Sequence, residues 1–407
     1  MSLPAPASPQ RLHGLDAVRG YALLLGVVFH ATMSFLPGPQ VWVLKDTESS
    51  AVLAAVFFVA HIFRMSTFFL IAGFFAHMTF HKRGPKAWIV DRLKRIGLPL
   101  VVGWPIIITS IALAAGYAVY VATGTFPTKG PPSPPAPPGA FPLTHLWFLY
   151  VLLLLYAATL AIRSLVTRFD RSGDVRRRVD GAVAALVRSP LSPAVLAIPA
   201  AAALAATPTW LAWFGIPTPD MNLVPNLPAW TQFFTAFGFG WLLHRQPALL
   251  ETWTRRWTLN LGVAVALTVG LLAYLGLTPV TDPPKPGAEH VGLACAYALC
   301  IWTWTFGVIG AALRFLSGES RVRRYIADSS YWIYLVHLPL VIFLQAAVSR
   351  LDWPWELKFA TVLGVGFAIM FATYELLVRH TFIGSVLNGR RVPWKTRATT
   401  TSQPEAA

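Results

Sequence analysis

The stretch LDAVRGYALLLGVVFHATMSFL, residues 15–36, has the length and composition of a membrane-spanning helix, since most of it is Leu, Val, Ala, Phe and Met. It also carries Arg19 and His30, two side chains that are costly in hydrocarbon and rare in membrane helices without a function. Their positions are eleven apart, which corresponds to about 16.5 Å of α-helix, or just over three turns. The two side chains therefore share one face of the helix at different depths.

Stretches of this kind recur along the 407 residues, of which 55% are hydrophobic and only 12% charged, with a mean hydropathy of +0.56. A soluble domain carries about twice that charged fraction. Each apolar segment is about 20 residues long, which is the length of a membrane-spanning helix. The strands of a membrane β-barrel instead alternate apolar and polar residues over about ten residues, so this fold is excluded. We predict an all-α polytopic membrane bundle of about ten transmembrane helices, at roughly 15–36, 51–80, 96–121, 144–162, 191–213, 226–243, 257–277, 291–313, 325–349 and 357–378.

The net charge of +16 follows this topology. The connections between spans form two alternating sets, and one set holds 26 Lys and Arg residues whereas the other holds five. This asymmetry is the positive-inside pattern, and it places both termini in the cytoplasm. It explains the basic excess without a nucleic-acid partner. We predict a multi-pass protein whose surroundings are a lipid bilayer, the inner (plasma) membrane of a bacterium.

The chain is predicted to form one transmembrane domain over residues 1–397, followed by a disordered tail over 398–407, whose composition is polar. The proline-rich stretch TKGPPSPPAPPGAFP, residues 128–142, predicts a stiff extended loop on the outer side. The largest cytoplasmic connection, residues 163–190, carries a run of arginines that suits a surface of anionic lipid.

Five motifs in order along the chain resemble the membrane-bound acyltransferase-3 family. LDAVRGYALLLGVVFH is similar to the opening signature of the family, in which ten residues separate an Arg from a His. The others are FRMSTFFLIAGFFAHM at 63–78, RLKRIGLPL at 92–100, HLWFLYVLLLLY at 145–156 and SSYWIYLVHLPL at 329–340. The first and last of these four are similar to the glucan biosynthesis protein C branch, thought to succinylate periplasmic glucans. One departure is Ala72, where many members have Ser, and it argues against a serine nucleophile there.

The resemblance implies transfer of an acyl group, succinyl or acetyl, from a cytoplasmic thioester to a hydroxyl at the outer side. Acyl-coenzyme A is the expected donor, used as a co-substrate rather than a permanently bound cofactor, and a carbohydrate such as a periplasmic glucan is the expected acceptor. In this scheme His30 is the general base that takes the hydroxyl proton, and Arg19 orients the pantetheine arm or a phosphate. Direct transfer, transfer through an acyl-histidine, and assembly as a homodimer are all left open.

Three basic residues, Arg92, Lys94 and Arg95, are predicted at the cytoplasmic mouth of the third span. They can bind the phosphates of coenzyme A by charge-assisted hydrogen bonds, although positive-inside topology alone also accounts for them. Arg64 lies near the middle of the second span, where an unpaired arginine costs about 3 kcal/mol on insertion scales. A carboxylate of a substrate, which would suit a succinyl group, and Glu375 in the last span are alternative partners for it.

Further polar and aromatic residues in the predicted spans are candidates for binding the acceptor: His61, His145, Trp147, Tyr334 and His337. Packing inside the bundle, or anchoring at the membrane interface, accounts for each of them as well. His77 and His81 have the i, i+4 spacing of two metal ligands, but no third ligand is evident from the sequence, so we predict no metal site.

A proton-coupled transporter of a small organic anion is the alternative function, because intramembrane Arg, His and Glu residues also occur in such carriers. The sequence has neither an inverted repeat nor a pair of Gly- or Pro-broken helices, and the five motifs favour an enzyme. The sequence therefore predicts a membrane O-acyltransferase.

Overall fold

The computed structural model describes residues 9–127, 140–389 and 391–393. The tail predicted over 398–407, and most of the loop predicted over 128–142, lie outside these residues. The described residues contain no β-strand beyond one isolated bridge, between Ala140 and Asn222. They form α1 Pro9–Thr32, α2 Ala51–Arg83, α3 Pro85–Arg92, α4 Leu98–Thr123, α5 Trp147–Phe169, α6 Asp174–Arg188, α7 Ser192–Ala205, α8 Leu227–Leu243, α9 Leu250–Leu275, α10 Ala288–Phe315, α11 Arg321–Val348, α12 Trp355–Thr373 and α13 Phe382–Leu387. The prediction of an all-α fold is confirmed.

Eight of the predicted spans coincide with helices that are long and apolar enough to cross a bilayer. The other two correspond to α7 and α8, which have 14 and 17 residues and are shorter than the roughly 20 that a bilayer requires. The apolar stretch predicted over 191–213 contains Pro208, and α7 ends before it, because the residue that precedes a proline is disfavoured in helix. The pair α6 and α7 bends by 107°, and would make a ninth span if the two cross the membrane together. The count of ten, and the cytoplasmic side of both termini, stay predictions.

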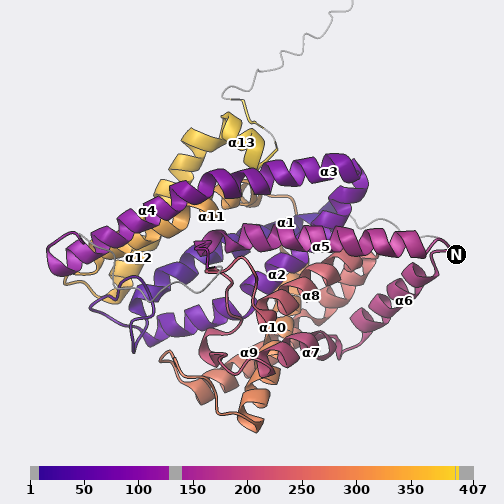
Figure 1. The fold of residues 1–407 in the computed structure, drawn as a ribbon, viewed down its shortest axis with the longest axis horizontal. Helices are drawn as coiled ribbons and strands as arrows, with labels where there is room; N and C mark the ends of the chain where they lie inside the picture. The colour runs from indigo at the N-terminus through magenta and orange to yellow at the C-terminus, as the bar shows by residue number, and fades with distance from the viewer. Residues whose placement is uncertain (1–8, 128–139, 390, 394–407) are drawn as a thin grey trace, which may run out of the picture.

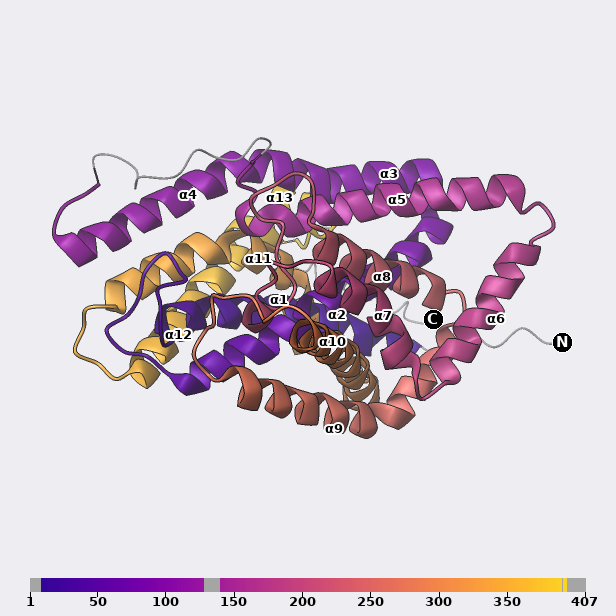
Figure 2. The ribbon, with the colours of Figure 1, turned by 60° about the horizontal axis from the view of Figure 1, so that its bottom comes forward.

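The long helices form an inner and an outer group. In their most apolar windows 67% of the residues of α2 and α10 and 56% of those of α1 and α11 are buried, against 17% for α4 and α9. Figure 1 and Figure 2 show α1, α2 and α11 in the middle of the bundle, with α4 and α5 along one side and α9 along the other. A site between the inner helices is therefore enclosed by a second layer.

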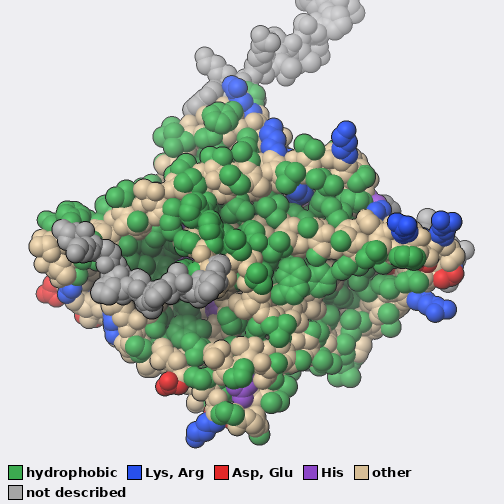
Figure 3. Space-filling model, viewed as in Figure 1, with side chains coloured by type: hydrophobic (Ala, Val, Ile, Leu, Met, Phe, Trp, Pro, Cys, Tyr) green, Lys and Arg blue, Asp and Glu red, His purple; other side chains and the backbone are tan. Residues whose placement is uncertain are grey.

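The apolar surface follows from this arrangement. Val101 and Leu113 on α4 leave 72% and 71% of their surface area exposed. In a soluble protein, large apolar side chains on a long helix would mostly be buried in the core. In Figure 3 hydrophobic side chains cover the middle of the face that carries α4 and α5, and most Lys and Arg side chains lie toward its margins. An apolar surface with charges at its margins identifies a helical membrane protein.

Small residues let α2 and α8 approach closely. A Cβ added at Gly73 would overlap the carbonyl oxygen of Phe237, and one added at Gly240 would overlap that of Leu70. Gln232 on α8 also donates a hydrogen bond to the Ser66 hydroxyl on α2, with 3.0 Å between Nε2 and Oγ. Close backbone contact and a buried polar bond are the means by which membrane helices associate. They fix the rotation of α2, and with it the direction of the side chains that α2 places in the site.

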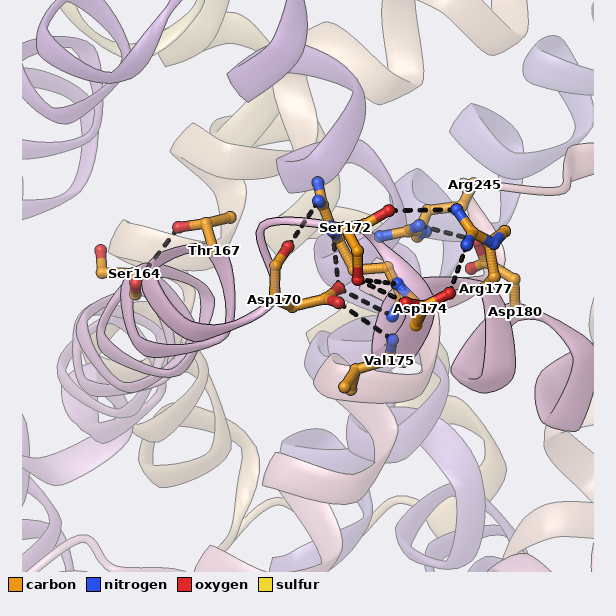
Figure 4. A network of polar contacts seen from close by, with 10 residues as sticks. Ser164, Thr167, Asp170, Ser172, Asp174, Val175, Arg177, Asp180 and Arg245 are labelled. Atoms are coloured by element: carbon orange, nitrogen blue, oxygen red, sulfur yellow. Dashed lines mark hydrogen bonds and ion pairs between the residues drawn. The ribbon is translucent and has the colours of Figure 1, made fainter.

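The turn between α5 and α6 is held by Asp170 (Figure 4). Its carboxylate accepts hydrogen bonds of 3.0 Å from the backbone N–H groups of Val175 and Arg176 and from Nε of Arg176. Burial raises the pKa of Asp170, but these hydrogen bonds outweigh it and hold the pKa below its ordinary value. Asp180 on α6 pairs with Arg245 after α8 at 2.7 Å. The arginine-rich connection is therefore a structured element joined to the bundle.

Candidate functional site

A cavity of about 30 Å³ lies between α1, α2, α11 and the start of α5. Six of the residues singled out from the sequence line it, although they come from four separate segments of the chain. The lining consists of Ala22, Leu23, Gly26, His30, Arg64, Met65, Phe68, His145, Trp147, Phe148, Tyr334 and His337. We call it the histidine cavity.

Three imidazole rings meet in the histidine cavity, because the ring centroids of His30 and His145 each lie 5.2 Å from that of His337. His337 Nδ1 is 2.7 Å from the carbonyl oxygen of Tyr334. A carbonyl only accepts, so Nδ1 carries the proton, and Nε2 is left as an acceptor. Nε2 is buried and has no hydrogen-bond partner among the described residues.

Pro339 explains the placement of His145. Proline lacks an N–H group and cannot donate to the carbonyl four residues earlier in its helix, that of Leu335. Nε2 of His145 lies 3.1 Å from this carbonyl oxygen and donates to it. The hydroxyl of Tyr334 in turn donates to the carbonyl of His145 at 2.8 Å. Nδ1 of His145 is therefore a second unpaired acceptor in the same cavity.

His30 itself has no hydrogen bond to a ring nitrogen among the described contacts, and its buried Nδ1 is unpartnered. Its ring stacks on Trp42 from the segment between α1 and α2, with 5.6 Å between centroids. Gln345 on α11 joins these two elements: it donates to the carbonyl of His30 at 3.0 Å and accepts from the Trp42 indole at 3.0 Å. The backbone at His30 is thus fixed while the imidazole nitrogens stay available.

Arg64 reaches the cavity from α2, and its guanidinium carbon lies 4.8 Å from the ring centroid of Phe29. Space for it exists because residue 26 is glycine: a Cβ there would lie 2.7 Å from Nη1 of Arg64. No carboxylate pairs with Arg64 within the part of the chain that is described, and its Nε is unpartnered. A cation with these properties suits an anion or an oxyanion supplied by a substrate.

Glu375 is not the partner of Arg64, so that alternative is wrong. Its carboxylate lies 2.8 Å from Nη1 of Arg379 and 3.2 Å from Nε2 of His380, and it accepts from the Tyr325 hydroxyl. Glu375 and Arg379 form an i, i+4 pair within the π-helical turn that ends the last span. Glu375 is absent from the lining of the histidine cavity.

A second cavity of about 350 Å³ lies on the side of Arg92 and Arg95. We call it the donor cleft after the acyl donor that these arginines are expected to bind from the sequence, a role that stays a prediction. Four arginines line it: Arg19, Arg83, Arg92 and Arg95. Asp91 neutralises part of this charge, since it lies 2.8 Å from Arg92 and 2.9 Å from Arg95. Arg19 pairs with Asp16 at 3.1 Å, with more than a third of each side chain exposed. Asp328 also lines the cleft, so four arginines face Asp16, Asp91 and Asp328 and one formal positive charge remains.

Lys94 does not line the donor cleft, unlike Arg92 and Arg95, and its predicted contact with a donor phosphate stays a prediction. Its side chain is exposed, and it lines only a shallow surface hollow with Lys86 and Val90. Consecutive helical residues point about 100° apart, so a basic run cannot put all its members on one face.

Arg19 and His30, one on each side of the midpoint of α1, line different cavities. Leu23, Phe68 and Phe148 line both, so these three side chains form the partition between the donor cleft and the histidine cavity. Phe68 and Phe148 are in edge-to-face contact, with 4.6 Å between centroids. A molecule that passes from one cavity to the other must displace these side chains.

His61 and His77 lie outside both cavities. The ring of His61 packs between Phe29 and Phe57, with centroid distances of 5.4 Å and 5.8 Å. Nδ1 of His77 lies 2.8 Å from Nδ1 of His244, a neighbour that the sequence spacing did not reveal. No group of three potential ligands in the described ranges has the geometry to hold a metal ion.

Sequence reasoning gave no site role to Trp42 or Tyr331 and did not single out Gln345 or Pro339. The hydroxyl of Tyr331 donates to the carbonyl of Arg95 at 2.7 Å. Pro339 carried a usable signal, because a proline inside a predicted membrane helix leaves one carbonyl free for a side chain. Trp42 and Gln345 carried none, since their contacts join positions 303 residues apart.

Known proteins are similar to this chain over most of its length. The curated relatives include the "Glucans biosynthesis protein C" of Salmonella paratyphi B, 27% identical over 86% of this chain and 86% of its own length. The protein of the same name from Shigella dysenteriae serotype 1 is 25% identical over 96% of this chain and 97% of its own length. No solved structure matches the chain. The acyltransferase-3 family model, described as "Acyltransferase domain", matches residues 12–374. The chain therefore belongs to the acyltransferase-3 family, and it is an acyltransferase of the membrane.

Proposed function

We propose that the enzyme transfers a succinyl or acetyl group from cytoplasmic acyl-coenzyme A to a hydroxyl of an extracytoplasmic carbohydrate, such as a periplasmic glucan, in the inner membrane of a bacterium. One observation carries the proposal: an arginine-lined cleft and a histidine-lined cavity share a partition of only three side chains. The name that the curated relatives carry supports a glucan as the acceptor.

The donor cleft suits the nucleotide end of coenzyme A. Arg92 and Arg95 line it together with Arg19 and can bind phosphates by bidentate, charge-assisted hydrogen bonds. The pantetheine arm is long and flexible, so a donor whose phosphates remain at the arginines can present its thioester at the partition. Arg19, on the same helix as His30, orients this arm.

The histidine cavity favours an acyl group that carries a negative charge. Its volume of about 30 Å³ holds one or two water molecules, so an acyl group enters it only by displacing side chains of its lining. Arg64 has no acidic partner among the described residues, so the terminal carboxylate of a succinyl group would supply the charge that it lacks. This argument places succinyl ahead of acetyl.

His30 serves as the general base. The hydroxyl oxygen attacks the thioester carbonyl, His30 takes the hydroxyl proton, the carbon–sulfur bond breaks, and the proton passes to the departing thiolate. The products are an ester and coenzyme A. General-base catalysis of this kind contributes about 10²–10⁴-fold. A neighbouring ring such as Trp42 keeps the imidazole in place without occupying its nitrogens.

The test uses purified protein in lipid vesicles, with [14C]succinyl-coenzyme A on one side of the membrane and a gluco-oligosaccharide on the other. We expect the oligosaccharide to gain the label as an ester, and His30→Asn to slow this at least 100-fold. The matched control is His290→Gln: His290 is another buried histidine, whose Nε2 bonds to the carbonyl of Leu204, and it lines neither cavity. Uptake of an unmodified oligosaccharide or organic anion would instead identify a transporter.

A further inference from the structure

His30 and His337 each leave one buried nitrogen without a partner in the same cavity. These atoms are Nδ1 of His30 and Nε2 of His337, on rings whose centroids lie 5.2 Å apart with a tilt of 45°. The two nitrogens differ in what they can do. The tautomer of His30 is not fixed by any described contact, whereas that of His337 is fixed by donation from Nδ1 to the carbonyl of Tyr334. Nε2 of His337 can therefore only accept a proton or a hydrogen bond.

We propose that His337 is a positioning residue, which acts through His30 as the orienting partner of the catalytic base. Its Nε2 accepts a hydrogen bond from the N–H of His30, directly after a small ring rotation or through one water molecule in the cavity. This bond selects the tautomer of His30 whose other nitrogen faces the acceptor hydroxyl. The inference rests on the proposed function, because it assumes that His30 is the catalytic base.

The chemistry follows the logic by which a base is oriented by a third group. When His30 takes the hydroxyl proton it becomes an imidazolium with two N–H groups. One N–H faces the reacting oxygen, and the other donates a hydrogen bond to Nε2 of His337. This second hydrogen bond persists until the proton on the first nitrogen passes to the thiolate. No proton is gained or lost by His337. Without it, a buried N–H of the imidazolium would have no acceptor, which is costly in a cavity of low dielectric.

The surroundings of His337 indicate that it orients His30 and does not bind a charged group of the substrate. The titratable groups that line its cavity are His30 from α1, Arg64 from α2, His145 from the turn before α5, and Tyr334 from its own helix. None of them is a carboxylate, so His337 takes the place that a carboxylate occupies in a Ser-His-Asp triad. The side chain is 3% exposed and cannot exchange its contacts with bulk water.

Two amide variants separate this role from a merely structural one. In His337→Asn the amide nitrogen replaces Nδ1, so the bond to Tyr334 is kept and the acceptor facing His30 is lost. In His337→Gln the amide reaches the position of Nε2, so an acceptor facing His30 is kept and the bond to Tyr334 is lost. Each variant is reconstituted beside the wild type and the His290→Gln control, with the same labelled succinyl-coenzyme A and gluco-oligosaccharide.

The proposal expects kcat to fall about 10- to 100-fold in His337→Asn, the range for a lost hydrogen bond to a charged group, and to recover most of this loss in His337→Gln. KM for succinyl-coenzyme A stays within about twofold in both, because neither touches the donor cleft. If kcat for His337→Asn equals or exceeds that for His337→Gln, the inference about His337 is wrong. The proposed function still holds in that case, provided that the wild type transfers label. If the wild type transfers no label, both are wrong. Thermal unfolding in detergent verifies that each variant folds.

Discussion

Replacement of Gly26 by alanine should displace the Arg64 guanidinium without damage to the fold. A Cβ at position 26 would lie 2.7 Å from Nη1 of Arg64, whereas ordinary contact begins near 3.4 Å. The guanidinium must therefore move by about 0.7 Å. Among the described residues, and apart from the neighbouring backbone of α1 itself, the other atom within 4 Å of the new methyl group is the guanidinium carbon, at 3.7 Å. The clash therefore involves the far end of a flexible side chain and not the backbone.

This displacement predicts a lower reaction rate without a loss of stability. Alanine is about 1 kcal/mol more favourable than glycine inside a helix, which offsets the cost of moving one side chain. A shift of about 1 Å in a group that binds the reacting acyl unit can cost about 100-fold in rate. We expect Gly26→Ala to keep the unfolding temperature of the wild type in detergent and to lower kcat by about 10- to 100-fold.

The assay is label transfer from succinyl-coenzyme A in vesicles. Gly270→Ala is the matched control, because a Cβ at Gly270 on α9 meets nothing within 4 Å. If Gly26→Ala unfolds at the temperature of the wild type and also transfers label at its rate, the assignment of Arg64 to the acyl group is refuted. If Gly26→Ala loses stability as well, Arg64→Gln serves as the second test, with the same expected loss of kcat.

Three further predictions concern other parts of the molecule. Lys358 and Asp46 form a fully buried ion pair at 2.7 Å. We expect Lys358→Met to lower the free energy of unfolding by about 3–5 kcal/mol, because it leaves Asp46 buried and unpaired. The double variant with Asp46→Asn should recover most of this loss, as measured by denaturation in detergent. Arg95→Ala should raise KM for succinyl-coenzyme A at least tenfold, whereas Lys94→Ala, outside the donor cleft, should change it less than twofold in the same kinetic assay. Because the pKa of Asp170 is lowered in the folded protein, its carboxylate stabilises the turn above the unfolded pKa of about 3.9, and this stabilisation is lost as pH falls through the folded pKa. At pH 7 a protease should therefore cleave the turn faster in Asp170→Asn than in the wild type. With an acid protease near pH 3 the difference between the two proteins should shrink.

The sequence by itself determined the class of the molecule. Hydropathy and length are local properties, so eight of the ten predicted spans coincide with long apolar helices, and the motifs around Arg19 and His30 indicated the family that the comparisons confirm. The cost of a charge in hydrocarbon also pointed to Arg64 as a residue that needs a ligand. These conclusions required no knowledge of which helices are neighbours.

Only the tertiary structure decided which side chains meet. Hydropathy says nothing about the rotation of a helix, so it could not separate Arg95, which faces the donor cleft, from Lys94, which faces away. Nor could it show that Glu375 is paired within its own turn, or that the carbonyl freed by Pro339 fixes the tautomer of a histidine 190 residues away. Such contacts depend on how the glycine-mediated packing of α2 and the other inner helices sets their rotation, and this is a property of the whole bundle.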